Sequence, residues 1–288
     1  MQVLGVSGTR SAFKYMIRWI MSDSSKPSAV DINRTFYGTT SSGRDDYWSK
    51  MAGPRYRLNT ILGLLEEQVP ASTVDLGCGN GQLLMEIHKR YPGMELCGID
   101  LSSAQIDANR LQGDKAHWYA MDLNHPVSLP PALVGRFETV IASEIVEHLD
   151  DPATFLRNAL ALGSPGRARL LLSTQSGRIR ETEKMVGHQR HFSQEEMRRT
   201  LQIAGWEPIR IWNSGFPFHD MSKWLANLNP DASMRRFLGH PYGPIENFMC
   251  LALRLAFRFN SQRQGAQLFA VARRPVAGSE ASTGCPEA

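Results

Sequence analysis

The segment from Val74 to Gly81, which reads Val-Asp-Leu-Gly-Cys-Gly-Asn-Gly, constrains the fold of this chain more than any other feature. Its apolar start predicts a buried strand, its glycines predict a tight turn, and the residues from Gln82 to Tyr91 predict a helix. Glycine adopts positive φ without steric cost and lets a ligand approach the backbone closely. Three glycines at alternate positions after a strand therefore indicate an α/β fold that binds a ligand at this turn.

Two residues of this region narrow the chemistry of the ligand. A dinucleotide site calls for the spacing Gly-x-Gly-x-x-Gly, whose amide groups face a pyrophosphate, but here Gln82 takes the place of the third glycine. The carboxylate of Asp75 would repel a pyrophosphate, whereas it would attract an ammonium group directly or through water. A cationic ligand is therefore favoured, and a purely structural turn is the alternative.

In this strand and turn the chain resembles the class I S-adenosylmethionine-dependent methyltransferases, and the resemblance extends over roughly 73–206. It implies their Rossmann-like fold, an α/β architecture with a doubly wound, mostly parallel sheet of seven strands. It also implies S-adenosyl-L-methionine as the cofactor. The residues of the turn that the resemblance assigns to the cofactor are Asp75, Gly77, Cys78, Gly79 and Gly81.

The next two strands are expected to end in acidic residues that hold the nucleoside. The segment 95–99 is followed by Asp100, about 20 positions beyond the glycines, where a doubly wound fold presents a carboxylate to ribose hydroxyl groups. Leu101 would then contact the adenine face. The segment 117–121 predicts a third strand, and the resemblance implies that Asp122 accepts a hydrogen bond from the adenine amino group. The predicted cofactor set also includes Leu123 and Ser143.

Further segments complete the expected sheet. Strands are predicted over 137–142, 168–173, 208–212 and 267–272, and helices are predicted to start at Pro54 and at the capping box that Ser193 opens. A connection as long as 213–264 needs structure of its own, and its aromatic residues favour a helical cap over the substrate. Dimerisation or membrane contact is the alternative for this segment, because Arg254 and Arg258 interrupt its apolar run.

The predicted organisation has a core over 45–212, the cap over 213–264 and the last core strand over 265–274, between an N-terminal extension and a C-terminal tail. The extension, 1–44, is expected to be partly disordered, and the tail, 275–288, disordered. The apolar stretch that ends at Ile20 is too short and too often charged to span a bilayer. A poorly ordered extension is favoured, and a basic amphipathic membrane contact is the alternative. Met21 is a second candidate for the start of the protein.

Composition sets the background for these predictions. The 288 residues carry a formal net charge of +4 without clustered Lys and Arg, a balance that does not indicate nucleic-acid binding. The cysteines lack the spacing of a metal site or of a disulfide framework. A cytoplasmic location is therefore expected. The four cysteines are Cys78, Cys97, Cys250 and Cys285.

A second polar cluster follows the fourth predicted strand, where open α/β folds place their chemistry. Glu144, Glu147 and His148 have a spacing that would place them on one face of a helical turn, where they could bind one divalent cation. His188, from a later loop, would be the fourth ligand. The pattern resembles ubiquinone-pathway O-methyltransferases and the enzymes that 2′-O-methylate small-RNA ends, and Mg, Mn or Zn would suit these ligands. Without a metal, His148 would act alone as a base. Either His188 or His191 is expected to contact the substrate.

The predicted chemistry follows from the cofactor and this cluster. Because the sulfonium makes its methyl group electrophilic, the protein mainly has to align a nucleophile and exclude water. A hydroxyl acceptor also has to lose a proton, which calls for a base or a metal. The sequence thus predicts methyl transfer to an oxygen, or else a nitrogen or carbon, of a small, partly apolar intermediate. RNA 2′-O-methylation and a non-catalytic cofactor-binding assembly protein are the alternatives, and a homodimer is compatible with each.

Overall fold

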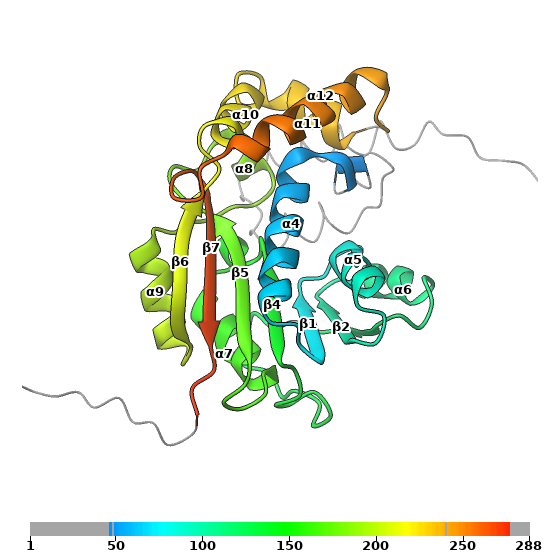
Figure 1. Cartoon of the computed structure of the whole chain (residues 1–288), viewed down its shortest axis with the longest axis vertical. Helices are drawn as coiled ribbons and strands as arrows, with labels where there is room; N and C mark the ends of the chain where they lie inside the picture. The colour runs from blue at the N-terminus through cyan, green and yellow to red at the C-terminus, as the bar shows by residue number, and fades with distance from the viewer. Residues whose placement is uncertain (1–45, 48, 240, 277–288) are drawn as a thin grey trace, which may run out of the picture.

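The computed structural model describes residues 46, 47, 49–239 and 241–276 of the chain. The predictions for 1–44, for Met21 as a start and for most of the C-terminal tail lie outside these residues. One seven-stranded sheet forms the centre, in the order β3-β2-β1-β4-β5-β7-β6, and only β7 runs against the other strands. This confirms the predicted doubly wound, mostly parallel sheet (Figure 1). The strands are Ser72–Leu76 (β1), Glu95–Asp100 (β2), His117–Ala120 (β3), Thr139–Ser143 (β4), Arg169–Gln175 (β5), Glu207–Ser214 (β6) and Gln267–Arg273 (β7).

The two faces of the sheet carry separate hydrophobic cores, because successive side chains of a strand point to opposite faces. Val74 and Leu76 belong to the core that also holds residues of α7 and α9. Ile141 and Leu171 belong to the other core, together with residues of α4, α5 and α6. The helices are Ala52–Glu67 (α4), Gln82–Arg90 (α5), Ser103–Arg110 (α6), Pro152–Leu162 (α7) and Gln194–Ile203 (α9).

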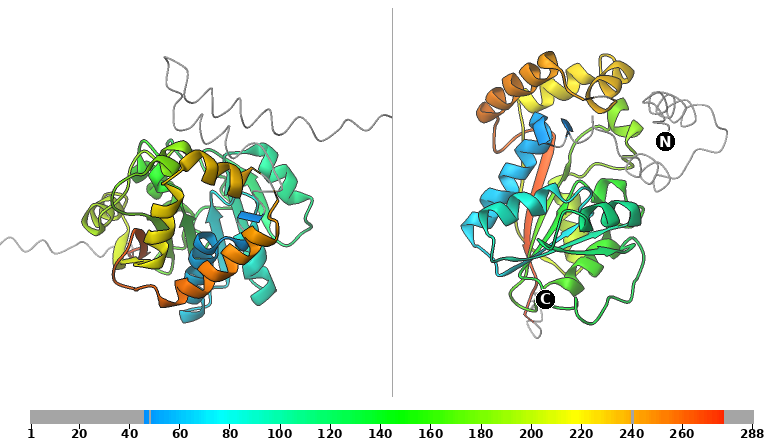
Figure 2. Two further views of the ribbon diagram at one scale, coloured as in Figure 1. Left: turned by 90° about the horizontal axis from the view of Figure 1, so that it is seen from above. Right: turned by 90° about the vertical axis from the view of Figure 1, so that its right-hand side faces the viewer.

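Helices also fill the connection between β6 and β7, as the length of that segment predicted. With α8, they lie over the carboxyl ends of the parallel strands, and we call the helices between β6 and β7 the cap (Figures 1 and 2). α12 packs against α4, and α11 packs against α8. The bounds are Glu181–Met185 (α8), Phe218–Ala226 (α10), Pro230–Leu238 (α11), Pro244–Ala256 (α12) and the 3-10 turn Phe257–Phe259 (η2).

Several predicted boundaries are shifted. The fourth strand starts at Thr139 and not at Phe137, which forms only an isolated bridge with Gly163. The first helix of the core starts at Ala52, two residues before the predicted proline. β5 and β6 each run two residues beyond their predicted ends, to Gln175 and Ser214, because they pair with β7 along its full length.

Candidate active site

The glycine turn between β1 and α5 is tied to the end of β2. Gly77, Gly79 and Gly81 have φ values of 69°, 50° and 72°, which glycine adopts without strain. The Gly77 N–H donates to the Ile99 carbonyl at 2.7 Å. A methyl group on Gly77 would lie 2.2 Å from the Ile145 side chain, and one on Gly81 would meet an indole at 2.6 Å, whereas Gly79 faces open space. The middle of the turn is therefore the part that leaves room for a ligand.

Asp100 joins this turn to the following helix. Its Oδ2 atom accepts from the Gly79 N–H at 2.8 Å, and its Oδ1 atom accepts from the Ser102 N–H at 2.9 Å. Burial raises the pKa of this carboxyl group, and the backbone donors oppose that effect. A carboxylate oxygen has two lone pairs, so each oxygen can still accept a hydrogen bond from a ribose hydroxyl. The position of Asp100 therefore fits the role that the sequence predicted.

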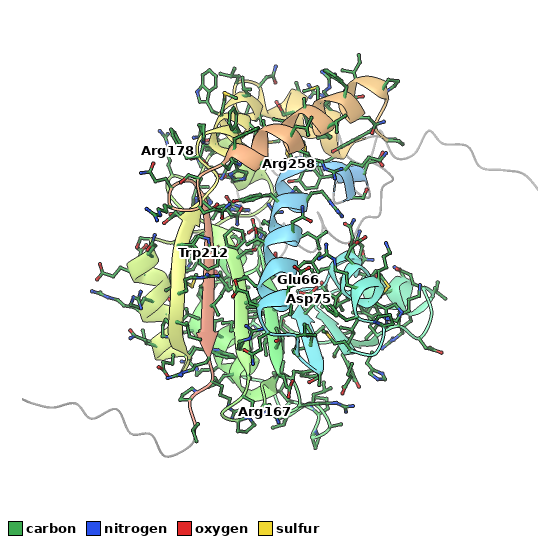
Figure 3. The ribbon with its side chains drawn as sticks, in the orientation of Figure 1. Glu66, Asp75, Arg167, Arg178, Trp212 and Arg258 are labelled. Carbon is green, nitrogen blue, oxygen red and sulfur yellow. The ribbon has the colours of Figure 1, made fainter. Side chains whose placement is uncertain are left out.

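Asp75 lies in β1, one residue before the last, and is almost completely buried (Figure 3). Burial, and then the charge of Asp100, raises the pKa of Asp75 to about 8. The free protein therefore holds this carboxyl group mostly protonated at neutral pH. A cation placed beside it would favour the ionised form, as expected for a carboxylate that receives an ammonium group.

The other predicted cofactor contacts lie along the same edge of the sheet. Asp122 accepts from the Asn124 N–H at 2.9 Å, which fixes the turn after β3. Leu123 is buried, Leu101 is partly exposed, and Cys78 is buried beside the glycines. Ser143 ends β4, and its hydroxyl group shares a hydrogen bond of 2.8 Å with the Ser173 hydroxyl on β5. The structure thus places the residues of this set at the carboxyl ends of β1 to β4, which is where doubly wound sheets bind ligands.

Glu144 departs from the prediction that it shares a helical face with Glu147 and His148. Its backbone has φ 57°, a left-handed conformation outside the 3-10 turn η1 (Val146–His148). The carboxylate instead accepts from Gln175 at 2.6 Å and from Gln267 at 2.9 Å, at the ends of β5 and β7. Burial opposes ionisation, but the Arg57 guanidinium and these amides hold the pKa of Glu144 below its ordinary value. Glu144 is therefore a structural carboxylate in this arrangement.

Glu147 is completely buried. Its Oε2 atom accepts from the Thr174 hydroxyl at 2.7 Å, while its Oε1 atom has no hydrogen-bond partner among the described residues. Burial, and then the charge of Glu144, raises the pKa of Glu147 well above its ordinary value. A buried oxygen without a partner is costly, so this atom is suited to meet a ligand or an ion.

Two histidine rings, those of His148 and His188, lie close to Glu147, and a third, His191, contacts His188. His148 Nδ1 lies 3.1 Å from the Gly187 carbonyl oxygen, and since that oxygen can only accept, Nδ1 carries the proton and Nε2 is the basic nitrogen. By the same reasoning His191 Nδ1 donates to the Gly177 carbonyl, and His191 Nε2 accepts from His188 Nδ1 at 3.1 Å. The rings of His148 and His188 are 4.7 Å apart between centroids. Burial lowers the pKa of His148 to about 4, so it is neutral at pH 7.

One group of ligand atoms could hold a metal ion. Glu147, His148 and His188 each offer an atom, and these atoms all lie within 4.8 Å of one another. A carboxylate and two imidazoles suit Mn or Zn better than Mg, which prefers oxygen ligands. The remaining predicted ligand, Glu144, does not belong to this group. Three of the four residues predicted for a metal are thus brought together.

No sequence motif identified the residues of α4 and of the cap that contact this site. Lys223 of α10 donates to Gln175 Oε1 at 2.7 Å and forms an ion pair with Glu183 of α8. Arg57 of α4 lies 3.7 Å from the Glu144 carboxylate. These side chains come from segments far apart in the chain and belong to no short motif. Only contacts in the folded protein reveal them.

Comparisons with known proteins agree with this geometry. The family described as "Methyltransferase domain" matches residues 47–211, more than half of the chain. The ubiquinone biosynthesis O-methyltransferase of Coxiella burnetii (strain Dugway 5J108-111) is 27% identical over 158 residues, which cover 51% of this chain and 64% of that protein. The chain thus spans less than two thirds of the length of the curated relatives that it matches.

Solved structures share the fold at low sequence identity. The [4+2]-cyclase SpnF superimposes with a TM-score of 0.57 at 16% identity, over 87% of this chain and 97% of that one. The plantazolicin methyltransferase BamL, solved with a triazolic desmethylPZN analog and SAH, gives 0.55 at 16% identity, over 92% and 97%. At such identities the likeness concerns the fold alone. The family match, together with the glycine turn and the acidic residues at the strand ends, shows that this chain belongs to the methyltransferase-domain family, whose membership implies S-adenosylmethionine as the cofactor.

Proposed function

We propose that this chain transfers a methyl group from S-adenosylmethionine to a hydroxyl group of a small, partly apolar molecule, with His148 as the general base. The observation that carries the proposal is the neutral, buried imidazole just beyond the carboxyl end of β4, oriented by the Gly187 carbonyl. The orientation makes Nε2 the proton acceptor. An oriented imidazole next to the cofactor edge is the usual arrangement for removing a proton from a hydroxyl nucleophile.

Charge balance supports an imidazole base in so buried a place. The acceptor oxygen forms a bond to the methyl carbon, the carbon–sulfur bond breaks, and its electron pair stays on sulfur. The cofactor therefore supplies an electrophilic methyl group and loses one positive charge. The proton that moves from the acceptor hydroxyl to His148 restores a positive charge in the same site, so the low-dielectric surroundings do not have to accommodate a new net charge.

The apolar residues of the cap favour a small and partly apolar acceptor. Met234 and Leu238 of α11 pack with Tyr47, Met185 and Val186 over the sheet edge that carries the site. Apolar side chains around a few polar groups are typical of small-molecule sites. His148 and the carboxyl group of Glu147 would supply those polar groups.

A divalent metal at Glu147, His148 and His188 is the alternative to a free imidazole base, because His148 Nε2 would then bind the ion and would not accept the proton. The unpartnered Oε1 atom of Glu147 and the close approach of the three ligand atoms fit such an ion. When bound, it would lower the pKa of an acceptor hydroxyl group. Equilibrium dialysis with zinc and manganese tests the group without reference to activity: Glu147→Gln should lose the ion, whereas Glu144→Gln should keep it. Equal binding by both variants would exclude this site.

Methyl transfer itself is tested with labelled S-adenosylmethionine and three pools of acceptors: phenols, lipid-quinone precursors and RNA. Label in a phenol or quinone precursor supports the proposal, and the position of the new methyl group identifies the acceptor atom. Label in RNA would replace it with the RNA-methylating alternative. Cofactor binding without transfer to any pool would favour the non-catalytic alternative.

A further inference from the structure

The outer side of the cap carries apolar side chains that no part of the described chain covers. On α10, Met221, Trp224 and Leu225 are exposed at positions i, i+3 and i+4, which lie on one face of a helix, and Leu228 is exposed in the turn just after it. The buried residue of this helix is His219, on the opposite side. α10 therefore turns its apolar face away from the protein, which is the reverse of an ordinary surface helix.

α12 repeats this reversed arrangement. Its inward side holds Glu246, Cys250 and, just beyond its end, Phe257. Phe248 is 71% exposed and Phe259 of η2 is 77% exposed, although large aromatic side chains are seldom left in water. The outward stripe consists of Ile245, Phe248, Leu251, Leu255 and Phe259.

The two apolar faces belong to neighbouring helices. α10 and α12 are in contact and lie together on the side of the molecule away from the sheet (Figure 2). Apolar residues scattered singly over a surface need no explanation, but an exposed set gathered on one element pair marks a site of contact with another surface. We call this set the cap surface, which comprises the exposed apolar residues named above in α10, in the turn after α10, in α12 and in η2.

The charges beside the cap surface indicate which partner it suits. Arg254 of α12 and Arg258 of η2 are exposed, and neither forms an ion pair with a carboxylate in the part of the chain that the structure describes (Figure 3 labels Arg258). The acidic residues nearby are engaged: Asp220 accepts from the Ala266 N–H at 2.9 Å, and Glu246 pairs with a guanidinium at 2.8 Å. Unpaired arginines beside an apolar face complement a partner that has anionic groups at its surface and an apolar interior.

We propose that the cap surface binds the interface of an anionic lipid bilayer, with the apolar stripes among the acyl chains and the two arginines at the phosphates. No helix in the described ranges is long and apolar enough to cross a bilayer, so the contact is peripheral. A second copy of the chain is a poorer partner. In a two-fold contact through this surface, Arg254 and Arg258 would approach their own counterparts with few free carboxylates to pair with.

Vesicle co-sedimentation tests the proposal with the full-length protein. The wild type should bind vesicles that contain phosphatidylglycerol and should bind phosphatidylcholine vesicles far less. Phe248→Ser with Phe259→Ser should weaken binding by about tenfold or more, because two interfacial aromatic anchors are lost. Leu111→Ser is the matched control, since Leu111 is 89% exposed at the end of α6, outside the cap.

Charge reversal isolates the electrostatic contribution to vesicle binding. Arg254→Glu with Arg258→Glu should weaken binding to anionic vesicles by roughly 25-fold or more, at about fivefold for each arginine lost. Arg198→Glu, on an exposed position of α9, should leave binding unchanged. Circular dichroism checks that each variant is folded.

A wild type that fails to bind anionic vesicles would overturn the proposal. If that wild type also sediments as a dimer in the analytical ultracentrifuge, while the aromatic double variant is a monomer, the cap surface would join two copies of the chain. Neither outcome bears on methyl transfer, which is measured separately.

Discussion

Replacing Asp75 with asparagine should stabilise the free protein at neutral pH. The pKa of Asp75 is raised from 3.8 to about 8, so the folded chain keeps a proton that the unfolded chain releases above about pH 4. Stability therefore falls as the pH rises from about 4 to about 8. At pH 7 the solution is roughly 3 units above the unfolded pKa, and 1.36 kcal/mol per unit gives a cost of about 4 kcal/mol, which the neutral amide avoids.

Urea unfolding of the wild type and of Asp75→Asn at pH 4 and pH 8 measures this effect. The variant should be more stable at pH 8 by several kcal/mol and should match the wild type at pH 4. Asp114→Asn, at an exposed position, should show no comparable change between the two pH values. A stability difference that is the same at pH 4 and pH 8, or a variant that is less stable at pH 8, would refute the reasoning.

The same variant links stability to cofactor binding. The ionised carboxylate of Asp75 is the form that attracts the ammonium group of the cofactor. With a pKa of about 8, Asp75 is ionised in only about one molecule in ten at pH 7 and about one in a hundred at pH 6. The affinity of the wild type should thus rise about tenfold between these pH values, whereas that of Asp75→Asn should be flat and lower. A wild-type affinity independent of pH over this range would contradict the role of Asp75.

Four further substitutions probe the site and its contact with the cap. His148→Ala should lower turnover by about 10²-fold to 10⁴-fold and change cofactor affinity little, as measured by steady-state kinetics and calorimetry; equal losses in both would remove the base. Gly79→Ala and Gly81→Ala both place alanine at positive φ, which costs about 1–2 kcal/mol, but only the methyl group at 81 also meets Trp118. In urea unfolding Gly81→Ala should therefore be less stable than Gly79→Ala by roughly 1–3 kcal/mol, whereas Gly79→Ala should lose more cofactor affinity. Lys223→Met should destabilise by about 3 kcal/mol in urea unfolding, since its buried carboxylate partner loses its counter-charge, and an unchanged midpoint would show that the ion pair does not secure the cap.

The fold could be predicted from local patterns because each pattern had a local cause. Short apolar segments identified the strands, and the glycines at 77, 79 and 81 do adopt positive φ. The acidic residues that follow the second and third strands lie at the carboxyl edge of the sheet, since parallel strands all end on the same side. The strand ends were less accurate, because pairing with β7 decides where β5 and β6 stop.

The polar cluster that follows β4 could be predicted only in part. A spacing of three and four residues predicts a shared face only if the backbone is helical, and Glu144 is not helical. Its conformation is held by Gln175 and Gln267, which lie 31 and 123 residues further along the chain. No pattern near Glu144 in the sequence predicts these partners. The pairing of Lys223 with Glu183 between the cap and α8 escaped prediction for the same reason.

Calorimetric titration with S-adenosylmethionine tests the central claim most directly: that the glycine turn and Asp100 hold this cofactor. The wild type should bind it, and Asp100→Asn should bind roughly 30-fold more weakly, because hydrogen bonds from the ribose to a charged acceptor contribute about 2 kcal/mol. NAD, titrated in parallel, should give no binding. A wild type that does not bind S-adenosylmethionine, or an Asp100→Asn variant that binds it with unchanged affinity, would contradict the account.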